Sequence, residues 1–384
     1  MSVRIRPIAP LLLRGMFRRC ESTRVGPPRI KVAVLYQALE PPVINGIRKP
    51  MKPGGYRDSG ADIAYVLKSN SIDVITPVSS PDPYNDEDWC WPDTEDGIVS
   101  AVEHGATHLW ANTILFAAHP LQTSAELDKY APNVNIIGQP PALVEQLDDK
   151  EYVNDMLRED GSYPMPKGWT FESPEDPELD RLPYPVVGKP IRGRGSYGVK
   201  LCATKNELLD HLRSLLAESS KAMVEEYLCG REGTVTVMPP SADVLHYWSL
   251  PLVLRYNHVD GIAPYNGVVA VTNNSSALSA QESESAPVYK SICRHCERAA
   301  ERLKTTAPIR IDVRQYGQGK TPDTFAIFDV NMKPNMTGPG RPGREDQASL
   351  TAMAASSIGW DYPTLLKYML ASARSLLELR TLKL

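Results

Sequence analysis

The sequence predicts an α/β protein of two or three packed domains. From residue 30 onwards, short apolar segments of β type alternate with segments of helical spacing. The chain has 384 residues, more than one core of roughly 100–200 residues accommodates. Its 42% hydrophobic and 23% charged residues exclude general disorder. No stretch approaches the roughly 20 uninterrupted apolar residues of a membrane-spanning helix, so we expect no membrane partner.

The first domain follows from strand–helix alternation. Four apolar runs read as strands, and two segments with helical spacing lie between them, an order typical of a parallel βαβ sheet. A Pro- and Gly-rich stretch over 40–55 is too long and irregular for a tight turn. The predicted strands are 30–36, 73–77, 107–113 and 134–137, and the predicted helices are 59–69 and 94–104.

The pattern changes near residue 140. A helical segment over 141–157 is interrupted at Asp149 and Lys150, and the rest mixes strands and helices before ending in helices rich in Ala and Leu. We predict strands over 184–190, 199–203, 222–227, 234–238, 309–313 and 325–330, and helices over 205–217 and 288–303.

Charge is distributed unevenly along the chain. Residues 1–30 hold seven Arg and one acidic residue, Glu21, which leaves 35 basic and 45 acidic residues elsewhere, a net charge of −10. An acidic body without a basic stripe argues against a nucleic-acid partner. The Arg-rich segment 1–28 is either an unstructured leader or a mitochondrial targeting segment, although Pro7 and Pro10 would interrupt a targeting helix. We therefore expect a cytoplasmic protein, with a mitochondrial location as the alternative.

Six scattered cysteines show no disulfide-like spacing, which is typical of an intracellular protein. Cys293, His295 and Cys296 form the only cluster. A zinc site would need a second ligand pair at suitable spacing, and none follows. We therefore expect two ordinary thiols on the helix over 288–303.

A glycine-rich segment, GRGSYG over 193–198, matches the pattern GxGxxG. A dinucleotide fingerprint must open a helix, whereas β-type residues follow here at once. The segment instead suits a glycine-rich hairpin whose backbone N–H groups close over phosphates, with Lys189 supplying a positive charge. A flexible hairpin without a ligand is the alternative.

Acidic side chains gather on the last two predicted strands. Alternation places Arg310 and Asp312 on one face of the first strand, and Asp329 and Asn331 on one face of the second. If the strands are adjacent, Asp312, Asp329 and Asn331 surround one point. Oxygen-only ligands suit Mg²⁺ or Mn²⁺ bridging nucleotide phosphates. Solvated charge on an exposed sheet face is the alternative.

A third motif, EEYLCGRE over 225–232, places carboxylates at the end of a strand. These groups can accept hydrogen bonds from an adenine amino group and from ribose hydroxyls. Alone the signal is weak, because acidic strand ends are common.

In this order the motifs resemble the ATP-grasp superfamily, and most closely its D-alanine–D-alanine ligase branch. The resemblance covers roughly residues 130–375, and it extends over 30–130 only in strand–helix order. It implies a three-domain architecture in which a parallel βαβ domain precedes two α+β subdomains that sandwich ATP. The implied boundaries are 29–140 for the N-terminal domain, 141–222 for the central subdomain and 223–384 for the C-terminal subdomain.

The resemblance also implies roles for individual residues. Lys150 and Lys189 would hold ATP phosphates under the loop of Gly193, Gly195 and Ser196. Glu225 would accept from the adenine amino group, and Glu232 would bind ribose. Tyr227 and Leu228 would line the adenine hinge by backbone contacts, and Glu226 is a further cofactor-binding residue. The remaining implied roles are two Mg²⁺ at Asp312, Asp329 and Asn331, and catalysis by Arg310, which would stabilise the oxyanion, and by Ser196.

Departures from the family pattern concern mainly the substrates. Asp329 stands where the family usually has Glu, and Gly195 replaces a Ser that positions the first substrate. The N-terminal domain lacks the family's D-alanine-recognition segments. Gly340 falls where D-alanyl ligases use a Ser hydroxyl on the acceptor carboxylate, so at least one of Arg341 and Arg344 is expected to meet that carboxylate instead. The alternative is that both arginines face solvent, as Arg on a Gly- and Pro-rich loop usually does.

These motifs predict an ADP-forming carboxylate–amine ligase that uses ATP and Mg²⁺ on amino-acid-like substrates other than D-alanine. Two alternatives remain open. One is a nucleotide-binding protein without ligase activity, and the other is an ATP-grasp phosphotransferase or a ligase with a thiol or hydroxyl acceptor. The expected partners are a small-molecule carboxylate and amine, with a homodimer as a possible assembly.

Overall fold

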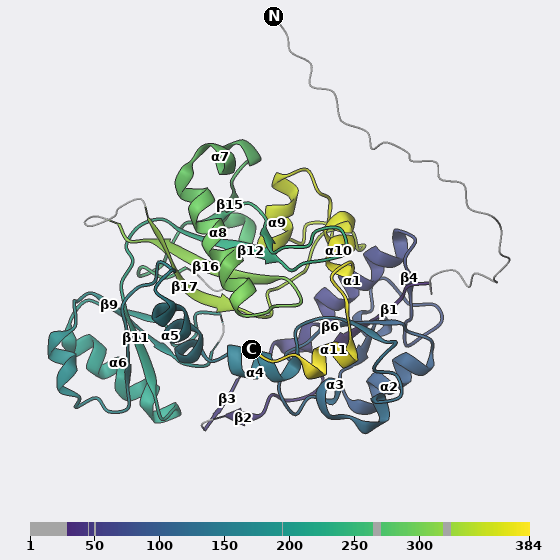
Figure 1. Ribbon diagram of the computed structural model, residues 1–384, viewed down its shortest axis with the longest axis horizontal. Helices are drawn as coiled ribbons and strands as arrows, with labels where there is room; N and C mark the ends of the chain where they lie inside the picture. The colour runs from purple at the N-terminus through teal and green to yellow at the C-terminus, as the bar shows by residue number, and fades with distance from the viewer. Residues whose placement is uncertain (1–28, 45, 50, 194, 264–269, 318–323) are drawn as a thin grey trace, which may run out of the picture.

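A computed structural model describes residues 29–44, 46–49, 51–193, 195–263, 270–317 and 324–384. The expected leader over 1–28 lies outside this part of the chain. The strands form three large sheets and one two-stranded hairpin, and Figure 1 shows helices packed on the large sheets. In that view the first sheet lies at the right, the second at the lower left and the third above and between them. This confirms the predicted mixed α/β architecture.

The first sheet has the order β18-β7-β6-β1-β4, and β5 also pairs with β1. Strands β1, β4, β5, β6 and β7 run parallel, as the βαβ pattern predicts. The interior of β1, Val32 to Leu35, is fully buried because α1 packs on one face of the sheet and other helices cover the opposite face. The elements are β1 (Lys31–Tyr36), β4 (Asp73–Val74), β5 (Cys90–Pro92), β6 (His108–Asn112), β7 (Asn135–Ile137), α1 (Arg57–Ser69), α2 (Glu95–Glu103), α3 (Pro120–Thr123), α4 (Pro141–Leu147) and the hairpin β2 (Val43–Ile44) with β3 (Ile47–Arg48).

The second sheet is antiparallel, with the order β10-β9-β11-β8, and α6 covers it. Thr204 caps α6, and Leu208, Leu212 and Leu215 recur at helical spacing to form a separate apolar cluster with the sheet. Helix α5 begins at Lys150 because the Asp149 side chain accepts from the Tyr152 amide, so the predicted interruption of the helix is confirmed. The elements are α5 (Lys150–Asp160), β8 (Gly168–Phe171), β9 (Val186–Pro190), β10 (Lys200–Cys202), α6 (Lys205–Glu218) and β11 (Ala222–Glu226).

The third sheet has the order β15-β14-β12-β16-β17, with β13 on β12, and all its pairs are antiparallel. Helix α8 packs on it through a buried stripe that includes Ile292 and Cys296. The elements are β12 (Glu232–Met238), β13 (Trp248–Ser249), β14 (Val253–Arg255), β15 (Ser275–Ala277), α7 (Ala280–Ser285), α8 (Pro287–Arg302), β16 (Ile309–Gln315) and β17 (Phe325–Asn331).

The end of the chain returns to the first sheet. Helices α9 (Leu350–Ser357) and α10 (Tyr362–Leu370) pack between the first and third sheets, and β18 (Arg374–Ser375) pairs antiparallel with β7 before α11 (Leu376–Thr381). Apolar residues of the first and third sheets share one continuous core. The predicted domain boundaries remain a prediction, but the C-terminal strand joins the sheet of the N-terminal domain.

The cysteine pair on α8 consists of two free thiols, as predicted. Cys296 is fully buried, and burial raises the pKa of Cys293 to about 11. Within the described ranges, no group of three or more His, Cys, Asp or Glu side chains is arranged to hold a metal ion. Nor does any described helix have the length and apolar character needed to cross a membrane.

A strained turn joins the Pro- and Gly-rich stretch to α1. Gly54 and Gly55 both have positive φ, at 73° and 59°, and a Cβ on Gly55 would lie 2.0 Å from the Gln37 carbonyl oxygen. A Cβ on Gly54 would meet nothing within 4 Å. This turn sets the position of Tyr56 at the start of α1.

We expect Gly55→Ala to destabilise the protein by about 3 kcal/mol, because it combines left-handed strain with a steric clash. Gly54→Ala is the matched control, since it adds the strain alone and should cost about 1 kcal/mol. Denaturant unfolding of both variants separates the two effects. Equal losses would show that the turn moves to accommodate the clash.

Candidate active site

A cavity of about 770 Å³ lies where the three sheets meet. Its size is typical of a cleft for a nucleotide and a small substrate. Every residue that we predicted for nucleotide binding, metal binding or catalysis lines it: Lys150, Lys189, Gly193, Gly195, Ser196, Glu225, Glu226, Tyr227, Leu228, Glu232, Arg310, Asp312, Asp329 and Asn331.

The second and third sheets meet at Lys189, near the end of β9. Its ammonium group donates to the Phe328 carbonyl on β17 over 3.0 Å and forms an ion pair with Glu225 on β11 over 2.6 Å. Lys189 therefore lies beside Asp329, the neighbour of Phe328. The two sheets thus bring Lys189 close to Asp329, one of the residues predicted to bind metal.

Glu225 is only 3% exposed, and its carboxylate is surrounded by donors from the protein itself. Its carboxylate accepts from Lys189, from Asn154 over 2.9 Å and from Arg158 over 2.5 Å. A buried carboxylate requires such partners. In this structure Glu225 therefore holds Lys189 in place. Its contact with an adenine amino group stays a prediction.

Two of the three residues that hold Glu225, Asn154 and Arg158, come from α5, and the sequence analysis missed them. Lys150, Asn154 and Arg158 recur every four residues and therefore share one face of the helix. That spacing is visible in the sequence. It identifies the face of α5 that packs against the polar junction of the two sheets.

Lys150 and Asp329 form an ion pair across the cavity wall. Burial alone would lower the pKa of Lys150, but the Asp329 charge outweighs it and raises the pKa above its ordinary value of 10.5. Burial alone would raise the pKa of Asp329, whereas the charges of Lys150 and Lys189 lower it below 3.8. Both groups are therefore charged at neutral pH.

This pair gives a prediction for the pH dependence of stability. Because the folded pKa of Asp329 is lowered, its contribution is present above pH 3.8 and is lost as pH falls through the folded pKa. We expect Asp329→Asn to reduce stability at pH 7, with the difference from the wild type shrinking below pH 3.8. Denaturant unfolding between neutral and acidic pH measures it. A difference that stays constant down to the lowest pH would contradict the assignment.

The predicted metal ligands lie on paired strands. Asp312 on β16 is directly opposite Asp329 on β17, and Arg310 is opposite Asn331. Arg310 donates to Asp312 over 3.0 Å, and Thr234 donates to the same carboxylate over 2.6 Å. Burial alone would lower the pKa of Arg310, but Asp312 raises it, so the guanidinium stays charged.

This donor set fits a hard divalent cation that completes its coordination with phosphate oxygens. The side chains that could bind the cation are two carboxylates, Asp312 and Asp329, and the carboxamide of Asn331. Each of them would bind through an oxygen atom. Asp312 and Asp329 would hold Mg²⁺, and Asn331 would complete the protein's share. When bound, the cation would neutralise phosphate charge.

The glycine-rich loop lies between β9 and β10, and the following helix, α6, starts only at Lys205. The loop is therefore not a dinucleotide fingerprint, as the sequence indicates. Gly195 and Ser196 both have positive φ, at 61° and 60°. The Ser196 hydroxyl donates to the Ala263 carbonyl over 3.5 Å, which links the loop to the connection between β14 and β15 of the third sheet.

Glu232, which is predicted to bind ribose, accepts from His258 over 2.9 Å and from Arg314 over 3.3 Å. Arg314 also donates to the Tyr227 hydroxyl over 3.1 Å. Sequence reasoning missed Arg314, although it follows Arg310 and Asp312 at strand alternation. These bonds fix Glu232 and Tyr227 at the wall of the cavity.

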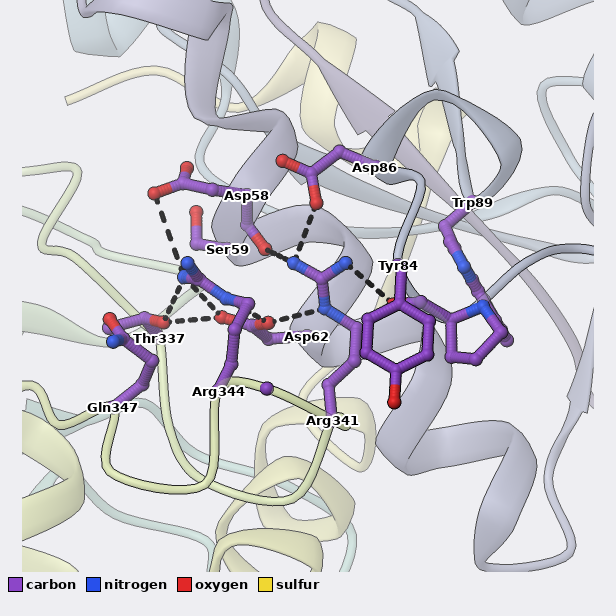
Figure 2. Close-up of polar contacts among 12 residues, drawn as sticks. Asp58, Ser59, Asp62, Tyr84, Asp86, Trp89, Thr337, Arg341, Arg344 and Gln347 are labelled. Carbon is purple, nitrogen blue, oxygen red and sulfur yellow. Dashed lines mark hydrogen bonds and ion pairs between the residues drawn. The ribbon is translucent and has the colours of Figure 1, made fainter.

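The structure does not place Arg341 and Arg344 where they could meet the carboxylate of an acceptor in the cavity. Gly340, Arg341 and Arg344 are absent from the described lining of the cavity. Figure 2 shows both guanidinium groups turned towards Asp62 on α1, which accepts from Arg341 over 2.8 Å and from Arg344 over 2.7 Å. Arg341 is 2% exposed and also pairs with Asp86 over 2.6 Å.

These bonds explain why the arginine prediction was wrong. Buried Asp62 needs cationic partners, and the two arginines supply them. Thr337 donates to the same carboxylate over 2.6 Å. The network ties the loop over 335–347 to α1, and the loop in turn places Asn335, Thr337 and Gln347 at the cavity.

The N-terminal domain contributes residues that the sequence did not reveal. Lys49, Lys52 and Tyr56, from the connection between β1 and α1, line the cavity together with Lys333, which follows β17. We call these four residues the lysine end. No family motif or periodic pattern marks Lys49, Lys52 or Tyr56, because the connection between β1 and α1 is irregular.

Two sheets that grip a cavity rich in lysine and carboxylate side chains define the ATP-grasp class. A family model described as "D-ala D-ala ligase C-terminus" matches residues 167–371, more than half of the chain. The chain therefore belongs to the D-alanine–D-alanine ligase family of the ATP-grasp superfamily.

Relatives and solved structures agree with this assignment. The chain is 25% identical to D-alanine–D-alanine ligase A of Bacillus cereus over 197 residues, which are 51% of this chain and 57% of the relative. The match thus spans little more than half the length of that relative.

The fold is similar to a crystal structure of D-alanine–D-alanine ligase from Bacillus anthracis complexed with ATP, with a TM-score of 0.60, 16% identity, and coverage of 91% of this chain and 98% of that one. It is also similar to VanG D-Ala:D-Ser ligase from Enterococcus faecalis, with a TM-score of 0.58, 14% identity, and coverage of 89% and 98%.

Proposed function

We propose that the protein is an ADP-forming carboxylate–amine ligase that acts on amino-acid-like substrates other than D-alanine. The observation that carries this proposal is the convergence of Lys150 and Lys189 with Asp312 and Asp329 in one cavity. Cations for phosphates and oxygen ligands for Mg²⁺ are the groups that phosphoryl transfer to a carboxylate requires. Membership of the ligase family supports the reaction type.

The proposed reaction has two steps. A substrate carboxylate oxygen attacks the γ-phosphorus of ATP, its bond to the β–γ bridging oxygen breaks, and ADP leaves. The amine nitrogen of the second substrate then attacks the acyl carbon and loses a proton, while phosphate leaves with the former carboxylate oxygen. Lys150 and Lys189 would hold the phosphates in line, and Arg310 would stabilise the oxyanion of the second step.

Substrates other than D-alanine are proposed because the acceptor end differs from the family pattern. Gly340 lies outside the described lining of the cavity, whereas the lysine end is part of that lining. A small-molecule carboxylate and a small-molecule amine are the partners that such a cavity accommodates.

A coupled ADP-release screen tests the proposal. ATP and Mg²⁺ would be combined with pairs drawn from amino acids of both hands, small carboxylates and amines, with D-alanine included. We expect ADP release to require a carboxylate and an amine together. Nucleotide binding without release by any pair would favour a protein that has lost ligation, and release with only hydroxyl or thiol acceptors would favour the other alternative.

A further inference from the structure

Three charged side chains form a row that starts at the cavity and ends behind its wall. Glu225 pairs with Lys189 over 2.6 Å through one carboxylate oxygen and with Arg158 over 2.5 Å through the other. Glu225 and Lys189 are buried and line the cavity, whereas Arg158 is absent from the described lining. The carboxylate therefore lies between a cation that lines the cavity and a second cation behind the wall.

The fold provides a specific place for the Arg158 guanidinium group. Gly168 on β8 lies directly opposite Glu225 on β11, and a Cβ on Gly168 would lie 2.3 Å from the guanidinium. Because glycine has no side chain, the guanidinium can occupy that space. Its Nε also donates to the Pro166 carbonyl over 2.9 Å. These contacts fix the orientation of the group that meets the Glu225 carboxylate.

The row of two cations and one carboxylate carries a net positive charge. Arg158 also pairs with Asp155 over 2.7 Å, but the Asp155 side chain is 52% exposed, and water weakens such a pair. Asn154, the third donor to Glu225, is neutral and cannot balance its charge. Without Arg158, the whole charge of Glu225 would act on Lys189, at a buried position where electrostatic interactions are strong. Lys189 would then attract a phosphate group less.

We propose that Arg158 is a positioning residue for nucleotide binding: it balances the charge of Glu225, so that the Lys189 ammonium group stays available to ATP phosphates. The inference rests on the proposed function and deepens it, because it adds to the nucleotide site a residue that does not touch the nucleotide. Arg158 acts through Glu225 and Lys189. Its effect on affinity must therefore depend on the charge of Glu225, unlike the effect of a residue that only stabilises the fold.

The affinity of the full chain for ADP with Mg²⁺, measured by titration calorimetry, tests this role. We expect Arg158→Gln to weaken ADP binding about tenfold, and Arg158→Lys, which keeps the charge, to weaken it by less than about threefold. Arg213→Gln is the matched control, because Arg213 is exposed and pairs with Asp210 on its own helix, so its affinity should equal that of the wild type. Thermal unfolding shows whether each variant is folded.

A second background tests whether charge is the cause. In Glu225→Gln the carboxylate charge is absent, so adding Arg158→Gln should weaken ADP binding by no more than about twofold. A residue that acted only through the fold would lower the affinity equally in both backgrounds. With the best substrate pair of the ADP-release screen, Arg158→Gln should raise the KM for ATP and leave the KM for the amine unchanged.

Two results would overturn the inference: unchanged ADP affinity in folded Arg158→Gln, or the same fold-loss in the Glu225→Gln background as in the wild-type background. If Arg158→Gln does not fold, Arg158→Lys decides, because a loss of about tenfold in that variant would show that Arg158 does not act by its charge. Failure of the proposed function is read separately. A wild-type chain that does not bind ADP contradicts the nucleotide site itself, whereas binding that Arg158→Gln leaves unchanged contradicts the role of Arg158 alone.

Discussion

Asp312→Asn is expected to lower ADP formation about a thousandfold, which corresponds to roughly 4 kcal/mol of transition-state stabilisation. Asp312 lies opposite Asp329 in the β16–β17 pair and accepts from Arg310 and Thr234. The substitution removes one of the two carboxylate charges available to a divalent cation and also the partner of Arg310. It keeps the size of the side chain, so the fold should be retained.

The measurement is ADP release with the best substrate pair of the screen, alongside thermal unfolding to confirm folding. Asp210→Asn is the matched control, because Asp210 is exposed and pairs only locally with Arg213. We expect that control to retain wild-type turnover. Wild-type turnover in Asp312→Asn would instead assign Asp312 to solvated charge on the sheet.

Asp62→Asn is expected to lower the free energy of unfolding by about 4 kcal/mol, the range found when one partner of a buried ion pair is removed. Asp62 has no exposed surface, and it accepts from Arg341, Arg344 and Thr337 (Figure 2). The amide leaves two guanidinium groups beside a neutral side chain. Urea or guanidinium unfolding of both proteins gives the difference.

Asp180→Asn serves as the control for a surface ion pair. Asp180 pairs with Lys205 at 67% and 39% side-chain exposure, and such pairs contribute about 0–1 kcal/mol. A loss in Asp62→Asn no greater than that of the control would mean that the arginine network is not what holds the loop over 335–347 to α1.

The part of this protein that could be predicted from its sequence is the part encoded locally. Apolar runs such as 309–313 and helical spacing such as 205–217 identify elements, since each pattern depends on neighbouring residues. Arg310 and Asp312 in the cavity followed the same rule, because strand alternation puts them on one face. Short strands such as β13, β15 and β18 carry too few residues for a pattern, and their pairing depends on distant segments.

The acceptor end could not be predicted for a different reason. Arg341 meets Asp62 across 279 residues of sequence, and no local pattern pairs them. A glycine- and proline-rich loop suggests exposed arginines, whereas the fold buries Arg341 against α1. The lysine end depends on the same kind of distant contact, between Asn112 and Lys333. By contrast, the spacing of Asn154 and Arg158 behind Lys150 was available in the sequence.

The most direct test of the central claim follows one oxygen atom. If ATP activates the substrate carboxylate in this cavity, a carboxylate labelled with ¹⁸O must pass one labelled oxygen to inorganic phosphate during amide formation. Mass spectrometry of the phosphate, with the best pair of the ADP-release screen, measures the transfer. We expect one labelled oxygen in each phosphate released. Phosphate without label, alongside ADP and product, would contradict an acyl phosphate and with it the ligase mechanism proposed for this site.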